Sequence, residues 1–288
     1  MYRSFEELFT EAESRDVPLW QVILENEMLV SEKTKEQVFE ELEDRWAVMS
    51  AAAVRALYES QKQDHALVEG LAMKQQAHSK LRSITGEGLN HMMAMAFSAS
   101  EVNASMGRVC AAPTAGSSGV LPAVLLSVIE GLHVSDQQLM EALLVAGGVG
   151  AIITRNATVA GAEGGCQAEC GAAAAMAAAA VVTLADGSPR MVGEAVSIAF
   201  MNCMGLVCDP VAGQVQLPCY YRNASQAVNA VISADMAMAG QKAAIPPDEV
   251  VEAMYKTGKR MAPELRETAA GGIAATPTAM KYTRKLQE

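Results

Sequence analysis

The sequence of 288 residues predicts an all-α fold, mainly helical and with at most minor short strands. Apolar residues near the N-terminus recur at helical spacing, as in Phe5, Leu8 and Phe9. Residues 167–184 are rich in alanine, which lets neighbouring helices approach closely. The chain shows neither an alternation of strand and helix patterns nor a repeat, and this argues against a parallel α/β fold. We therefore expect one compact helical domain.

The N-terminal part of the chain, residues 1–60, is acidic and helical in pattern. Residues 1–50 hold 13 acidic and 5 basic side chains, a net charge of −8. Capping-box spacing marks two helix starts, at Ser4 with Glu7 and at Thr34 with Gln37. We expect this acidic region to pack on the rest of the chain, residues 61–288, with the helical pattern running on through residues 51–82.

Caps, prolines and glycines place the later helices. The expected helices are residues 91–104, 135–147, 167–184, 189–204, 224–241 and 247–255. Ser135 with Gln138 begins the second of these, and Gly147-Gly148 is expected to end it. Ser188 before Pro189 begins the fourth. A short helix is expected to begin at Pro263, and residues 281–288 are expected to form a basic tail after the turn at 269–273.

Composition excludes several classes of function. The net charge of −11 argues against nucleic acid as a partner. No apolar run follows the first charged residues, so no signal peptide is expected. The longest apolar run, residues 172–185, is shorter than the roughly 20 residues that cross a membrane. We expect a cytoplasmic protein, in which six cysteines are free thiols or metal ligands and not disulfides.

A Gly/Ser loop precedes an apolar helix at residues 112–119, with the sequence Ala-Pro-Thr-Ala-Gly-Ser-Ser-Gly. Free backbone N–H groups and hydroxyls at such a junction favour a carboxylate or phosphate. A tight turn between two helices explains the same composition equally well. The candidate substrate-binding residues here are Thr114, Gly116, Ser117 and Ser118.

Three cysteines fall on segments shaped by glycine and proline, namely Cys166, Cys208 and Cys219. Gly205 and Gly213 are expected to supply tight bends around the second of them. Three thiolates suit an iron–sulfur cluster in which one iron lacks a protein thiolate and acts as a Lewis acid. A zinc site is the alternative, since Cys166/Cys170 and Cys203/Cys208 have zinc-ligand spacing. Otherwise Cys110, Cys170 and Cys203 are expected to be buried core thiols.

Several motifs resemble the iron–sulfur-dependent bacterial L-serine dehydratases, and specifically the α subunit of the two-subunit form. They are Gly-Cys-Gln-Ala-Glu at 165–169, Cys-Asp-Pro-Val-Ala-Gly at 208–213 and Val-Gln-Leu-Pro-Cys at 215–219. The spacing of 42 and then 11 residues between the three cysteines is also that of the family. The Gly/Ser loop and residues 255–272 match further family segments, so that the resemblance covers roughly residues 75–275.

The resemblance implies the deamination of L-serine to pyruvate and ammonia by a [4Fe–4S] cluster with an open coordination position. It implies Cys166, Cys208 and Cys219 as the cluster ligands and residues 61–288 as the cluster-binding catalytic part. Single-chain relatives carry a Ser-Ser-Ser-His-Thr segment whose histidine is proposed for catalysis. None of the four histidines here, His65, His78, His91 and His133, follows a serine run. The catalytic base is therefore expected on a separate β subunit.

Three other interpretations stay open at this stage. A pyridoxal-phosphate serine dehydratase could use Lys80 after Ser79 as its Schiff-base lysine, although no other lysine lies between Lys80 and Lys242. A related cluster-dependent dehydratase could act on another hydroxy acid or amino acid. A helical scaffold with a structural zinc–cysteine site would not be an enzyme at all.

Overall fold

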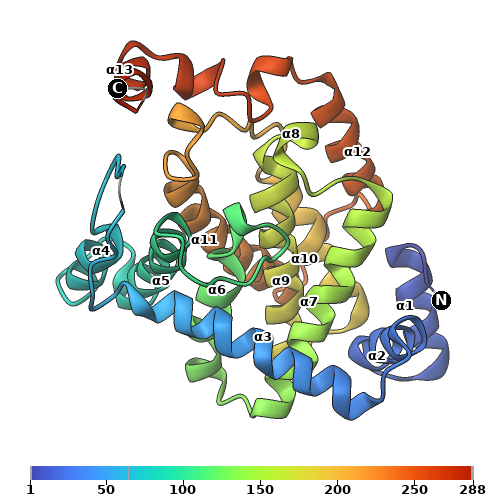
Figure 1. The fold of residues 1–288 in the computed structure, drawn as a ribbon. Coiled ribbons are helices and arrows are strands. Elements are labelled where there is room, and N and C mark those ends of the chain that lie inside the picture. The colour runs from blue at the N-terminus through green and yellow to red at the C-terminus, as the bar shows by residue number, and fades with distance from the viewer. Residues whose placement is uncertain (1, 64, 287–288) are drawn as a thin grey trace.

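The computed structural model describes residues 2–63 and 65–286, and these residues confirm the all-α prediction (Figure 1). They form thirteen α-helices. The first seven are α1 (Phe5–Arg15), α2 (Leu19–Ser31), α3 (Lys35–Arg55), α4 (Leu71–Ser79), α5 (Gly86–Ala104), α6 (Val120–Leu132) and α7 (Asp136–Asn156). The others are α8 (Gly161–Gly164), α9 (Ala172–Leu184), α10 (Pro189–Met201), α11 (Cys219–Met238), α12 (Pro247–Arg260) and α13 (Pro277–Lys285).

Helix α9 lies at the centre of the molecule and packs against α6, α7, α10 and α11 (Figure 1). Its small side chains explain this position, because Ala172–Ala180 lets four helices approach one axis, and every alanine in that stretch is fully buried. Apolar side chains of α1–α3 belong to the same continuous core. The division of the chain at residue 60 stays a prediction.

Two helix ends differ from the sequence prediction. Helix α3 stops at Arg55 instead of continuing toward residue 82, because Ser98 takes over the next hydrogen bond. The Ser98 hydroxyl accepts from the Ala56 N–H and donates to the Ala52 carbonyl, both at 2.8 Å. Helix α7 does not end at Gly147-Gly148. Gly148 instead allows close packing on α2, where a Cβ would lie 2.6 Å from Ile23 Cδ1.

The remaining corrections lie in the C-terminal half. Helix α10 ends at Met201, so that Cys203 lies in the following turn and not in the helix as predicted. Helix α11 begins at Cys219, five residues earlier than predicted, directly after Pro218. The expected basic tail is largely helix α13, capped by the Thr276 side chain. Among the described residues no strand forms, and one isolated bridge pairs Cys208 with Arg266.

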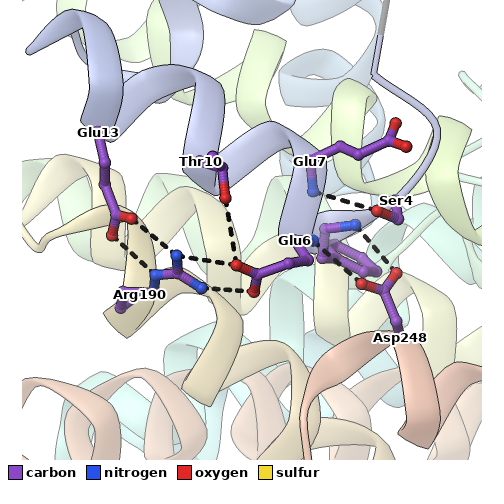
Figure 2. Close-up of polar contacts among 8 residues, drawn as sticks. Ser4, Glu6, Glu7, Thr10, Glu13, Arg190 and Asp248 are labelled. Atoms are coloured by element: carbon purple, nitrogen blue, oxygen red, sulfur yellow. Dashed lines mark hydrogen bonds and ion pairs between the residues drawn. The ribbon is translucent and has the colours of Figure 1, made fainter.

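The acidic N-terminal region is held against the C-terminal half by charged groups (Figure 2). Asp248 of α12 accepts hydrogen bonds from the Phe5 and Glu6 N–H groups at the start of α1, at 2.9 and 3.0 Å. A carboxylate is favoured there, since the first N–H groups of a helix have no partner within it. Arg190 of α10 donates to both Glu6 and Glu13.

Two helical stretches, Asp136–Asn156 and Gln167–Leu184, have the length and hydropathy of membrane spans. The second is longer than the apolar run seen in the sequence, because its first turn joins the alanine helix. However, 67% and 89% of the residues in the most apolar 18-residue window of each stretch are buried within the protein. Both are therefore helices of the protein core.

Candidate active site

Cys166 is placed by a glycine turn between α8 and a short π-helix, Gln167–Gly171. Gly165 has φ +75°, and a Cβ on it would lie 2.7 Å from the Leu206 carbonyl oxygen. Only glycine combines this conformation with so close an approach. The turn brings Cys166 beside the segment that leads to Cys208.

Gln167 joins the two cysteine segments from inside the core, where its side chain is fully buried. Its Oε1 accepts from the Gly205 N–H at 2.8 Å, and its Nε2 donates to the Gly164 and Met254 carbonyls at 2.9 and 3.0 Å. One side chain thus satisfies backbone groups of three separate segments, as buried polar groups require.

Cys208 lies on an extended segment bonded to the C-terminal part of the chain. Its N–H donates to the Leu265 carbonyl at 2.9 Å, and its carbonyl accepts from the Glu267 N–H at 2.7 Å. The next residue, Asp209, accepts from Arg222 and from the Ile273 N–H, both at 2.7 Å. Gly205 and Gly213 on either side have φ +86° and +70°, which confirms the predicted bends. Residues 265–273 therefore cover the Cys208 segment.

The predicted ligand thiols converge, and a fourth thiol joins them. Cys166, Cys170 and Cys208 form one buried cluster. A hydrogen bond between the Cys166 and Cys170 thiols lowers the pKa of Cys166 and raises the pKa of Cys170. Burial raises the pKa of Cys208 and raises that of Cys219 to about 12, and the nearby Cys166 contributes to both. Cys170, predicted to be a core residue, is therefore also a neighbour of the site.

Arg222, one turn into α11, faces this cluster. Its Nη1 donates to the Val207 carbonyl at 2.7 Å. Burial lowers the pKa of Arg222, but the charges of Cys166 and Asp209 outweigh burial and raise it overall. A guanidinium beside a thiol favours the thiolate, which is the form that binds metal. A set of soft sulfur donors with an adjacent cation fits an iron–sulfur cluster of net negative charge.

Cys203 does not belong to this set. Its thiol donates to the Ala199 and Phe200 carbonyls of α10 at 3.4 and 3.5 Å, and burial raises its pKa to about 12. It packs in the main core against Gly171. The arrangement therefore weighs against a zinc site that needs Cys203. Cys110 is half-buried and donates weakly to its neighbour's carbonyl at 3.8 Å.

The Gly/Ser loop contacts the thiol site through one pair of side chains. Thr114 Oγ1 donates to Glu169 Oε1 at 2.9 Å, and Gly116 lies next to the same carboxylate. Ser117 and Ser118 are buried, and their hydroxyls bond within the loop. Asn223 of α11 fixes the loop by donating to the Gly116 carbonyl at 2.7 Å. Substrate binding by these four residues stays a prediction.

Glu169 is the main residue that the sequence analysis left without a role. Its Oε2 lies 3.8 Å from Cys208 Sγ, and burial, together with the charge of Glu267, raises its pKa. Acceptor atoms of Glu169, Cys208 and Glu267 all lie within 4.8 Å of one another. A charged residue inside the Cys-Gln-Ala-Glu-Cys motif was the available signal. For Arg222 the signal was its isolation, as the only basic residue between Arg190 and Lys242.

The other candidate groups lie elsewhere. Lys80 is exposed and paired with Glu87 at 2.6 Å, which does not suit a Schiff-base lysine. His91 Nδ1 bonds to Gln76 at 2.5 Å, and His133 ends helix α6. In the described part of the chain, none of the four histidine rings hydrogen-bonds to Cys166, Cys208 or Cys219.

Comparison with known proteins identifies the family of the chain. The family model "Serine dehydratase alpha chain" matches residues 14–274. The chain is 44% identical to the probable L-serine dehydratase alpha chain of Bacillus subtilis, over 99% of this chain and 95% of that one. It is also 44% identical to the L-serine dehydratase alpha chain of Peptoniphilus asaccharolyticus, over 99% and 98% of the two chains.

A longer relative is the L-serine dehydratase of Streptomyces coelicolor, which is 36% identical over 95% of this chain and 60% of its own length. The chain thus covers 95% and 98% of two separate alpha chains and 60% of a longer protein. These matches confirm the resemblance drawn from the cysteine motifs, and the chain belongs to the family of bacterial L-serine dehydratase alpha chains.

Proposed function

We propose that this chain is the cluster-binding subunit of a cytoplasmic two-subunit L-serine dehydratase that forms pyruvate and ammonia. The convergence of Cys166 and Cys208 beside Arg222, with Cys219 at the adjoining helix start, is the observation that carries the proposal. These three thiolates would hold a [4Fe–4S] cluster. When bound, the cluster supplies an iron that lacks a protein thiolate and serves as a Lewis acid toward the substrate hydroxyl.

The residues of this chain bind and orient the substrate. The backbone of the Gly/Ser loop at Gly116 receives the serine carboxylate, while the Thr114 hydroxyl holds Glu169 beside it. In the elimination the α-proton and the β-hydroxyl leave as water. The enamine product then tautomerises and is hydrolysed by water to pyruvate and ammonia. The chain has no Ser-Ser-Ser-His-Thr segment, and the name "alpha chain" of the relatives suggests a β subunit, to which we assign the catalytic base.

The test is the iron and acid-labile sulfide content of protein reconstituted without oxygen. We expect about four of each per chain, lost in Cys166→Ser, Cys208→Ser and Cys219→Ser and retained in Cys203→Ser and Cys110→Ser. Adding the β subunit should then give L-serine deamination. One equivalent of zinc without sulfide would overturn the cluster and support the scaffold interpretation.

A further inference from the structure

Two carboxylates of this chain meet beside Cys208. Glu169 comes from the π-helix that follows Cys166, and Glu267 comes from the segment that covers Cys208. Each offers an oxygen within 4.8 Å of the other and of Cys208 Sγ. Glu169 is half-buried and Glu267 is exposed, and the charge of Glu267 disfavours a negative charge on Glu169, an effect that a bound cation would relieve.

The orientation of Glu169 is fixed on two sides. Thr114 Oγ1 holds Oε1 at 2.9 Å. On the other side, Oε2 packs closely against Gly161. A Cβ at residue 161 would lie 2.6 Å from Oε2 and 3.1 Å from Cys208 Sγ, so only glycine fits beside the carboxylate. A carboxylate restrained in this way is preorganised for a ligand.

No basic side chain of the described residues forms an ion pair with either carboxylate. Elsewhere, acidic groups close to arginine or lysine do pair, as Asp209 does with Arg222 and Glu163 with Lys259. The partner of Glu169 Oε2 is the Cys208 thiol at 3.8 Å. This contact is long, and no other group of the described residues donates a hydrogen bond to Oε2.

The substrate provides the missing cation. In serine the ammonium is carried by the carbon next to the hydroxymethyl group, so that a hydroxyl at the thiol site places the ammonium close to the same cysteines. The serine carboxylate lies on the carbon that bears the ammonium. The Thr114 loop and Glu169, which are joined by a hydrogen bond, therefore suit the two charged groups of one amino acid.

We propose that Glu169, with Glu267 opposite, binds the α-ammonium of the substrate and so selects amino acids over hydroxy acids of the same size. This role rests on the proposed function, because it assumes that the hydroxyl binds at the thiol site. It makes Glu169 a specificity-determining residue. A hydroxy acid would leave two facing carboxylates without a cation, which disfavours its binding.

The experiment uses the iron-loaded chain with its β subunit and compares wild type with Glu169→Gln and Glu267→Gln. Glu163→Gln is the control, since Glu163 is exposed on α8 and pairs only with Lys259. Three quantities are measured: the iron and sulfide content, kcat and KM for L-serine, and the inhibition constant of L-glycerate. Glycerate carries a hydroxyl where serine carries the ammonium.

We expect Glu169→Gln to keep its iron and to raise KM for L-serine at least about tenfold, the loss of one charge-assisted hydrogen bond. Glycerate inhibition should stay equal or become stronger, so that the preference for the amino acid falls by the same factor. Glu267→Gln should act in the same direction, and Glu163→Gln should leave both constants unchanged.

Three results would overturn the role of Glu169. If the ratio of KM for L-serine to the inhibition constant of L-glycerate is unchanged in Glu169→Gln, Glu169 does not bind the ammonium. Loss of iron in Glu169→Gln alone would make it a support of the metal site. A fall in kcat with an unchanged KM would assign it to the chemical step. Wild-type protein that holds no iron would instead overturn the proposed function itself.

Discussion

Asp209 and Arg222 form a buried ion pair, with 2.7 Å between Asp209 Oδ1 and Arg222 Nη2 and side chains only 2% and 13% exposed. The pair joins the segment next to Cys208 to helix α11, which begins with Cys219. Asp209 also accepts from the Ile273 N–H, and so ties the covering C-terminal segment to the same point. Asp209 therefore links the Cys208 segment both to the start of α11 and to the C-terminal segment that covers it.

Replacing Asp209 by alanine should lower the free energy of unfolding by about 3–5 kcal/mol, because the buried guanidinium would lose its counter-charge. Urea unfolding of purified protein measures the change. Asp235→Ala, at an exposed position of the same helix α11, should cost less than about 0.5 kcal/mol. Equal stability of the two variants would contradict the role of the ion pair.

Gln167→Leu should lower stability by roughly 2–4 kcal/mol, since the Gly205 N–H and two carbonyls would be left buried without their partner. The exposed Gln137 of α7 gives the matched control, and Gln137→Leu should have little effect. Thermal unfolding followed by circular dichroism compares the two. If both variants have the same Tm, Gln167 does not stabilise the contact between the cysteine segments.

Two adjacent glycines of α7 should respond with opposite signs. Gly147 has no atom within 4 Å of a Cβ position, so Gly147→Ala should stabilise the helix by about 0.5–1 kcal/mol. Gly148→Ala should cost about 1–3 kcal/mol, because its Cβ would meet three Ile23 atoms at 2.6–3.0 Å. The urea midpoints of both variants and wild type measure these changes in stability. The double variant Gly148→Ala/Ile23→Ala should recover part of the stability lost in Gly148→Ala.

The attachment of α1 should depend on pH through Arg190. Its hydrogen bonds lower the pKa of Glu6 and Glu13 below the ordinary value of 4.5. The stabilisation is therefore fully present above pH 4.5 and is lost as the pH falls through the lowered pKa values. At pH 7 and low salt, Arg190→Met should cost about 1 kcal/mol or less, since these side chains are largely exposed.

The difference between Arg190→Met and wild type should shrink in 0.5 M salt and toward pH 3, as screening and protonation remove the attraction. Arg284→Met, on α13, provides a charge-matched control without this ion pair. A difference that stays constant from pH 7 to pH 3 would show that Arg190 acts by packing on Phe9, over which its guanidinium lies at 5.5 Å.

Removing iron from the reconstituted protein should loosen the ligand segments, because the free energy of metal binding also stabilises the fold around the metal. We expect amide hydrogen exchange at residues 205–213 to rise at least about tenfold after chelation, while the amides of α9 stay protected. Cys203→Ser should behave as wild type does. Unchanged exchange at residues 205–213 would mean that the thiol segments are fixed by the protein alone.

Much of the fold followed from local patterns. The capping box at Thr34 and Gln37 and the one at Ser135 and Gln138 both form as predicted. In two places where the prediction was wrong, a distant residue had intervened. Ser98 interrupts α3, and Gly148 of α7 packs against Ile23 instead of ending the helix. Such contacts depend on partners more than forty residues away, and a local pattern does not contain them.

The sequence by itself determined the helical class, the family and the three cysteines at 42- and 11-residue spacing, because periodicity, caps and motifs are local properties of the chain. Only the tertiary structure decided which charged groups surround the thiols. It brought Arg222 to Cys166, Glu169 to Thr114 and Glu267 to Cys208, while it left Cys203 in the core. Electrostatic and hydrogen-bond interactions act over a few ångströms in space, and the packing of helices around α9 sets those distances.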